Sequence, residues 1–200
     1  MALATERNDI DAQGLAFAAL DANPGASLAY GRKSLIDDDG RPFRFDAERG
    51  LHVSPEGRAV AYDGALDKPL GDDPVERYRR VLASNDTNAP IYGLFRRSVF
   101  ARSPRFQIHG VDRLLVAHAA LHGPFAFVNA ELLRYRVHAA STVFLDRKAR
   151  IARETDGQRA SSLDAVKTLY QYLCVVHHSP LTPARRRAAY RATLGGLTLK

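Results

Sequence analysis

The spacing of apolar positions along the chain predicts a mixed helix and strand structure. Apolar residues recur every three to four positions in several segments, which is typical of helices with one buried face. Short apolar or alternating runs bounded by Gly, Pro or Asp are typical of strands. Helices are predicted at residues 12–22, 72–84, 112–121, 163–178 and 182–195, and strands at 26–31, 124–129 and 131–138.

The remaining segments have weaker patterns. Residues 36–42 read IDDDGRP, a composition that favours a turn, and residues 43–72 have little periodicity. We expect the second segment to be largely irregular, with a short hairpin. A loop of that length in a compact domain is usually functional or mobile. Residues 88–103 are expected to form a brief strand and then a short helix.

The composition fits a folded protein without a disulfide. The chain has 200 residues, 46% of them hydrophobic, and one cysteine, Cys174. The apolar runs are too short to span a bilayer, and the N-terminus lacks the pattern of a signal peptide. We therefore expect a cytoplasmic protein.

The charge is strongly basic, and arginine dominates it. The formal net charge is +7, and 24 of the 29 basic residues are arginine. Arginine binds phosphate in a bidentate manner, so nucleic acid, anionic lipid or a phosphorylated small molecule would each suit such a surface. Residues 183–191, PARRRAAYR, form a basic helix that would fit an acidic membrane surface or a phosphate, although a solvated face of a terminal helix is the favoured interpretation.

Familiar catalytic motifs are missing from the sequence. There is no nucleophile elbow, Walker loop, Gly-x-Gly-x-x-Gly or zinc-binding Cys/His cluster. His118 and His122 are four residues apart, which suits a metal pair, but histidines near a helix end are more often packing or capping residues. The acidic run at 37–39 is too short for an EF-hand and is more typical of a turn.

Among the acidic residues, Asp112 is the strongest candidate for a catalytic role. It stands at the start of an apolar helix, where it would act as an N-cap worth about 1 kcal/mol. A carboxylate at the mouth of a cleft can also act as a general base toward an acceptor hydroxyl. The residue types alone leave both interpretations open.

The segment APIYGLFRRSVFARSPRFQIHGVDRLLVAHAALHGPFAFVNAELLRYRVHAAST resembles the C-terminal part of family-two glycosyltransferases, which are inverting enzymes of the GT-A fold. The resemblance rests on three ordered elements: Tyr92 to Arg96, Gly110 to Gly123 and Tyr135 to Ser141. The segments LAFAALDANPGASLAYGRKSLIDDDGR and YLCVVHHSPLTPARRRAAYRA also resemble parts of such enzymes. The resemblance implies an α/β fold: a partial GT-A-like structure with a short mixed sheet, flanking helices and a C-terminal helical pair.

The resemblance also implies functional residues and domains. Asp112 corresponds to the catalytic base, His138 to the histidine after the last strand, and Arg136 to a residue facing a phosphate. Asp9 and Asp11 form an Asp-x-Asp that corresponds to the family's metal site for Mn²⁺ or Mg²⁺, or else a polar turn before the first helix. We expect a truncated catalytic or acceptor lobe over 1–146, a polar linker over 147–162 and a helical extension over 163–200.

The family's N-terminal nucleotide-binding half has no counterpart in this sequence. The expected activity is transfer of a sugar from a nucleotide-diphosphate sugar to a hydroxyl acceptor with inversion, with the site completed by a partner subunit or by self-association. The alternative is a non-catalytic relic that acts as a binding or scaffold module. A nucleic-acid-binding protein is a further alternative, which the scattered arginines and the absence of a helix-turn-helix signature disfavour. Peripheral contact with the inner face of an acidic membrane is compatible with the glycosyltransferase interpretation.

Overall fold

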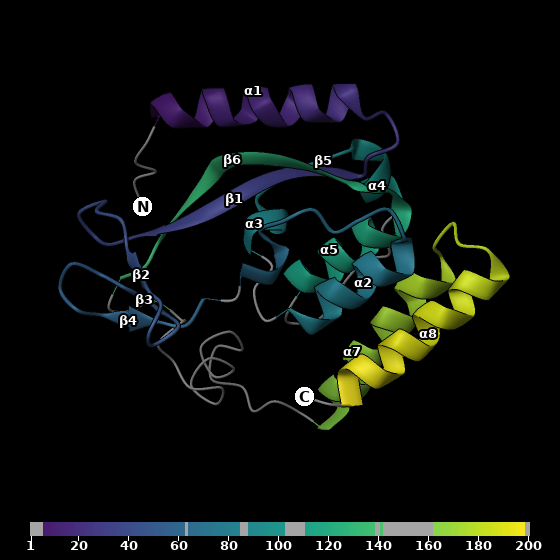
Figure 1. Ribbon diagram of the computed structural model, residues 1–200. Helices are drawn as coiled ribbons and strands as arrows, with labels where there is room; N and C mark the ends of the chain where they lie inside the picture. Colours follow the sequence, from purple (N-terminus) through teal and green to yellow (C-terminus); the bar gives the residue numbers. More distant parts are fainter. Residues whose placement is uncertain are drawn as a thin grey trace.

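The computed structural model describes residues 6–62, 64–84, 88–102, 111–138, 141 and 162–198 (Figure 1). This part of the chain contains helices together with a mixed sheet and a small antiparallel sheet, so the fold is α/β, as expected from the sequence. The elements are α1 (Glu6–Ala22), β1 (Leu28–Ile36), β2 (Arg44–Asp46), β3 (Leu51–Val53), β4 (Ala59–Val60), the short 3₁₀ helix η1 (Gly64–Leu66), α2 (Pro74–Ala83), α3 (Asn88–Ile91), β5 (Leu94–Phe95), α4 (Arg97–Ala101), α5 (Val111–His122), β6 (Phe125–Arg136), α7 (Ser162–His177) and α8 (Pro183–Thr198).

The main sheet has the strand order β5-β1-β6. β1 pairs in parallel with β6 and antiparallel with the two residues of β5, so the sheet is mixed, as predicted. The two long strands run side by side across the molecule (Figure 1). This sheet forms the layer on which the helices pack.

The prediction of two strands at 124–129 and 131–138 is wrong, because β6 is one continuous strand of 12 residues. Its pairing with β1 shifts near the middle: Gly31 lies opposite Val128, whereas Arg32 lies opposite Glu131. The pairing shifts again after Arg32, so three residues of β6 in all have no counterpart in β1, and one of them is the polar Asn129 that interrupts the apolar pattern. A bulge interrupts the sequence pattern without ending the strand.

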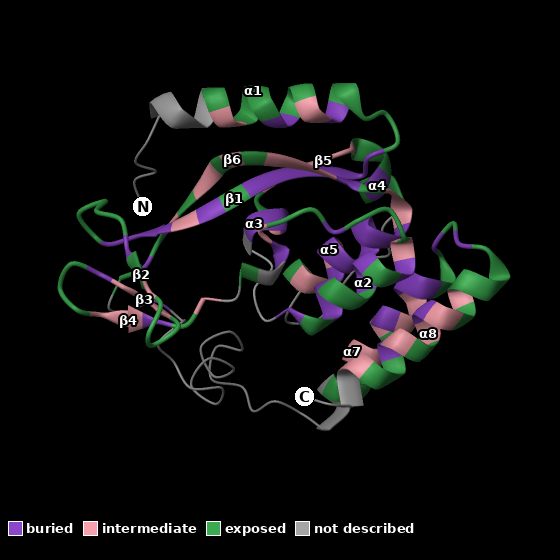
Figure 2. Cartoon of the chain, in the orientation of Figure 1, coloured by how far each residue is buried: buried purple, intermediate pink, exposed green. Residues whose placement is uncertain are grey.

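The helices cover the two faces of the sheet unequally. On one face, α1 packs through a small cluster of buried residues that includes Ala16 and Leu20. On the other face, α2 and α5 contribute to the main hydrophobic core together with Leu28 and Tyr30 of β1. Figure 2 shows this second face as the part of the molecule where buried residues are concentrated.

A glycine allows the close packing on the α1 face. A Cβ atom on Gly31 would lie 2.5 Å from the Cγ atom of Leu132 and 2.7 Å from the carbonyl oxygen of Ala130. Real Cβ atoms do not approach so closely, so β1 needs glycine where the bulged part of β6 crosses it.

The long segment between β1 and α2 contains more structure than its sequence suggests. Residues 43–72 were expected to be largely irregular with a short hairpin, but they hold a three-stranded antiparallel sheet with the order β2-β3-β4 and the helix η1. Val60 packs with Leu35 of β1 and Val137, so this small sheet is joined to the main sheet by a hydrophobic cluster of its own. Strands of two or three residues are too short to show a periodic pattern.

The C-terminal helices complete the main core. Tyr172 and Val175 of α7 and Ala189 of α8 are buried in the same hydrophobic cluster as β1. The hydroxyl groups of Tyr78 in α2 and Thr193 in α8 are hydrogen-bonded at 2.7 Å. The helical pair is thus packed directly on the sheet-bearing part of the protein. The predicted polar linker at 147–162 lies outside the described residues except for its last position.

No helix in the described part of the chain is long and apolar enough to cross a membrane.

Candidate functional site

Asp112 lies in the first turn of α5, with an exposed side chain. α5 is followed by a two-residue turn and then β6, so the helix runs antiparallel to β6. The N-terminus of α5 therefore points toward the carboxyl ends of the parallel strands β1 and β6. Ligands of open α/β sheets are usually bound at the carboxyl ends of parallel strands, and the helix dipole there favours a negative charge.

Arg136 and His138 lie at the carboxyl end of β6. Nη1 of Arg136 donates hydrogen bonds to the carbonyl oxygens of Asp37 (2.8 Å) and Asp38 (2.5 Å), so the guanidinium holds the turn that follows β1. The backbone N–H of His138 donates to the hydroxyl of Ser141 at 2.8 Å, and its side chain is exposed. Arg136 thus has a structural task beside any contact with a phosphate.

Asp112 lies at the end of α5 that is directed toward the carboxyl end of β6, but the lengths of the two elements separate it from Arg136 and His138. At a rise of about 1.5 Å per helical residue and about 3.3 Å per strand residue, β6 is about 20 Å longer than α5. Asp112 is therefore level with the middle of β6, whereas Arg136 and His138 lie beyond the start of the helix. A ligand that touched all three would have to be extended.

The acids predicted to bind a metal lie on the other face of the sheet. Asp9 and Asp11 belong to α1, which covers the face opposite α5. The side chain of Asp11 is exposed, and that of Asp9 is outside the described part of the structure. Because the sheet separates Asp11 from Asp112, one ligand meets both residues only by passing around an edge or an end of the sheet.

Among the described residues, one group of three acidic side chains is close enough to share a cation: Asp37 and Asp39 of the turn after β1, and Glu56 of the turn between β3 and β4. Arg41 forms ion pairs with all three, at 2.8 Å to Asp37 and 3.0 Å to Asp39. Its guanidinium therefore already supplies a positive charge to the group. The acidic run is a turn, as the sequence predicted.

Asp37 organises this turn. It is 2% exposed and accepts hydrogen bonds from the backbone N–H groups of Asp39 and Arg41. Burial alone would raise the pKa of its carboxyl group, but the backbone and side-chain hydrogen bonds from Arg41 outweigh burial and hold the pKa below its usual value. Gly40, with φ of 82°, takes the left-handed conformation that the turn requires.

The rings of His118 and His122 are in contact at a tilted angle, with His118 buried and His122 half-buried. Their ring centroids are 4.0 Å apart. Nε2 of His118 bonds to the carbonyl oxygen of Val99 at 3.0 Å, and Nδ1 of His122 bonds to the carbonyl oxygen of His118 at 2.8 Å. Burial, followed by the neighbouring charge of His122, lowers the pKa of His118 to about 4. These contacts fit the packing role rather than a metal pair.

A cluster of rings and a lysine was not foreseen from the sequence. The ring of Phe45 lies 5.2 Å from that of His52, which lies 5.2 Å from that of Tyr62. Nζ of Lys33 is 4.2 Å from the centre of Tyr62 and 5.1 Å from that of Tyr135. The members come from distant parts of the chain: the register of the small sheet pairs Phe45 with His52, whereas Lys33 and Tyr135 belong to β1 and β6 of the main sheet.

The histidine of this cluster has a lowered pKa. Burial and then the charge of Lys33 lower the pKa of His52. Its ring is therefore neutral over a wider pH range than that of a free histidine, which suits a ring packed between two aromatic neighbours.

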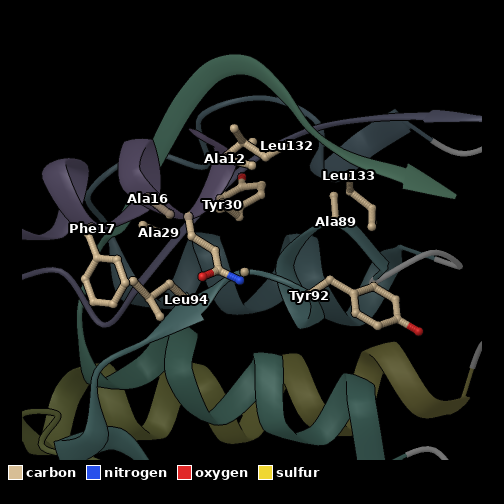
Figure 3. Close-up of a pocket in the computed structure, with 13 residues that line it drawn as sticks. Ala12, Ala16, Phe17, Ala29, Tyr30, Ala89, Tyr92, Leu94, Leu132 and Leu133 are labelled. Carbon is tan, nitrogen blue, oxygen red and sulfur yellow. The ribbon is translucent and has the colours of Figure 1, made fainter. Parts of the chain in front are cut away.

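A cavity of about 420 Å³ opens beside the two-residue strand β5, between α1 and the main sheet (Figure 3). Its wall is mostly apolar, and Phe17 and Tyr92, at 55% and 66% exposure, stand at its sides. None of the catalytic, phosphate-binding or metal-binding residues predicted from the sequence lines this cavity. The lining residues are Ala12, Gln13, Ala16, Phe17, Ala29, Tyr30, Gly31, Ala89, Tyr92, Gly93, Leu94, Leu132 and Leu133.

Comparison of the chain with models of protein families, with curated proteins and with solved structures finds no match in any of the three. The functional argument consequently rests on the residues and their geometry.

Proposed function

We propose that this protein is the acceptor-side lobe of an inverting glycosyltransferase, in which Asp112 is the general base. The observation that carries the proposal is the position of Asp112: an exposed carboxylate in the first turn of the helix that leads into β6, facing the carboxyl end of a parallel strand pair. A carboxylate in this position can take the proton of an attacking hydroxyl.

In this proposal the acceptor hydroxyl attacks the anomeric carbon of the donor sugar as its proton passes to the Asp112 carboxylate. The bond from that carbon to the diphosphate breaks, and the nucleotide diphosphate leaves with the bonding electrons. Arg136 and His138, farther along the same end of the sheet, would contact the negatively charged part of the donor. A cytoplasmic location, where nucleotide sugars are made available, belongs to the same proposal.

A divalent cation, Mn²⁺ or Mg²⁺, would neutralise charge on the leaving diphosphate. Carboxylate oxygens are suitable ligands for such an ion, and Asp11 offers an exposed one. Because Asp11 and Asp112 lie on opposite faces of the sheet, the metal and the base need separate tests. A partner subunit, or a second copy of the chain, would complete the donor pocket.

The first test is calorimetric titration of the protein with UDP, GDP and dTDP, each with and without Mn²⁺. We expect one nucleotide to bind only when the metal is present. Asp11→Asn should abolish this metal-dependent binding. Asp21→Asn, at an exposed acid on the same helix, should leave the binding unchanged. Absence of binding by every nucleotide, with and without Mn²⁺, would reject a donor site in this chain and leave a non-catalytic binding module.

The second test concerns the base. If transfer to a hydroxyl acceptor is found, Asp112→Asn should abolish it without unfolding the protein, because asparagine has nearly the same shape and the lost interaction with the helix dipole is worth at most about 1 kcal/mol. Transfer that survives the substitution would reduce Asp112 to a helix-stabilising residue. Asp21→Asn again serves as the matched control.

A further inference from the structure

The charge of the protein is concentrated at its C-terminal end. Residues 165–200 contain six lysine and arginine residues and no aspartate or glutamate, although the whole chain has 22 acidic residues. The net charge of the whole chain is +7. A surface formed by this segment is therefore positively charged, with no acid of its own to neutralise it.

Two of these arginines share an exposed face of α8. Arg187, Arg191 and Leu194 follow each other at intervals of four and three residues, which places them on one side of the helix. All three are exposed, Leu194 by 50%. The buried residues Ala189 and Thr193 lie on the opposite side, against the core.

The other arginines of α8 are engaged within the protein. Arg185 lies 3.8 Å from the carboxylate of Asp73, and Arg186 donates hydrogen bonds to the carbonyl oxygens of Ser179 (3.1 Å) and Leu181 (3.2 Å). In the described part of the structure, no ion pair involves Arg187 or Arg191. Their charges are thus available to an external anion.

α7 adds large apolar side chains to the same outer layer. Val166 and Tyr170, 62% and 65% exposed, are one turn apart on the side of α7 that faces away from the buried Val175. α7 and α8 lie side by side at the outside of the molecule (Figure 1), and the hydroxyl of Tyr190 bonds to Nδ1 of His177 across them at 3.4 Å. Figure 2 shows exposed turns along this outer layer.

We propose that this outer face of α7 and α8, formed by Val166, Tyr170, Arg187, Arg191 and Leu194, docks on a bilayer that contains anionic lipids. Arginines beside exposed tyrosine and aliphatic side chains match the two parts of a membrane interface, the phosphate headgroups and the upper acyl chains. Nucleic acid would use the arginines but would leave Val166 and Leu194 without an apolar partner. The protein binds peripherally, and the docking is independent of the proposed transfer activity.

The test is sedimentation of the full chain with vesicles of phosphatidylcholine alone or mixed with phosphatidylglycerol, at ionic strengths of about 0.1 M and about 1 M. We expect partition only onto the mixed vesicles and only at the lower ionic strength. Arg187→Gln with Arg191→Gln should weaken partition about thirtyfold, at about fivefold for each arginine near an anionic surface. Arg44→Gln with Arg49→Gln, an equal change of charge at exposed positions near the small sheet, should leave it unchanged.

A second pair of variants tests the apolar part of the face. Tyr170→Ser should weaken partition about tenfold, because the ring loses its place among the acyl chains. Phe45→Ser, at a position that is 63% exposed on the small sheet, should have no effect. Equal binding to both kinds of vesicle, equal losses in the control variants, or binding to single-stranded DNA in place of vesicles would each overturn the proposal.

Discussion

His118 should make the protein sensitive to mild acid. Its side chain is 0% exposed, its ring centroid lies 4.0 Å from that of His122, and Nε2 is hydrogen-bonded to the carbonyl oxygen of Val99. A proton on this ring would put a charge inside the core beside a second histidine. The folded protein therefore resists protonation, and the pKa of His118 falls from 6.5 to about 4.

The sign and the size of the effect follow from linkage. Between these two pKa values the unfolded chain binds a proton at His118 that the folded protein does not, so the free energy of unfolding decreases as the pH falls. The limiting slope is about 1.4 kcal/mol per pH unit, and His118 alone should lower stability by about 2 kcal/mol between pH 7 and pH 5. His122 and His52, whose pKa values are also lowered by burial, act in the same direction. The pKa values of Asp37 and Asp73 lie below 3.8, so their contributions change only at lower pH.

The assay is urea unfolding of the wild type and of His118→Gln at a series of pH values between about 7 and about 5. Glutamine can keep a hydrogen bond to the Val99 carbonyl oxygen but does not titrate, so the variant should lose stability with a clearly smaller slope, whatever its stability at neutral pH. Gly14→Ala, a control that changes no titratable group and meets nothing within 4 Å, should keep the slope of the wild type. If His118→Gln retains the full slope, the buried ring is not the source of acid sensitivity and the reasoning fails.

Three further predictions concern stability. Gly31→Ala should destabilise the protein by about 1–3 kcal/mol, because its Cβ would overlap Leu132. Gly14→Ala in α1, whose Cβ would meet nothing within 4 Å, should be neutral or stabilising by up to about 1 kcal/mol. Chemical denaturation compares the two variants. Asp73→Ala should lower the free energy of unfolding by about 1 kcal/mol in the same assay, because the Asp73 carboxylate caps α2 by accepting hydrogen bonds from two backbone N–H groups. An unchanged midpoint would show that the cap is dispensable. Arg77→Ala should lower the thermal midpoint by several degrees, because the buried guanidinium donates hydrogen bonds that tie α2 to α5 and to the preceding loop. A midpoint within error of the wild type would contradict that role.

Periodicity was sufficient for the long helices and failed for the strands of the small sheet. The predicted helix at 72–84 corresponds to α2, which begins after its Asp73 cap, and the predicted helix at 163–178 corresponds to α7. The strands β2, β3 and β4 have two or three residues each, fewer than any periodic signal needs. The break predicted inside β6 is a bulge, which looks the same as a strand end in a sequence pattern.

The candidate site shows the same limit. The sequence singled out Asp112, Arg136 and His138 one by one, and their order along α5 and β6 implies a common end of the molecule. It did not show that α5 is too short to bring Asp112 level with the other two, or that Arg136 holds the carbonyl oxygens of the turn after β1. The cluster around Lys33 was not foreseen, because its rings come from segments that meet only in the folded protein.

The sequence by itself determined the α/β class, the positions of the long helices and the basic, acid-free C-terminal segment. These properties depend on neighbours within a few residues or on composition, and both are visible along the chain. The tertiary structure alone decided that Asp11 and Asp112 face opposite sides of the sheet, that His118 is buried, and that Arg187 and Arg191 are left without an internal ion pair among the described residues. Each of these outcomes depends on contacts between distant segments, where packing and burial select among conformations that the local pattern leaves equivalent.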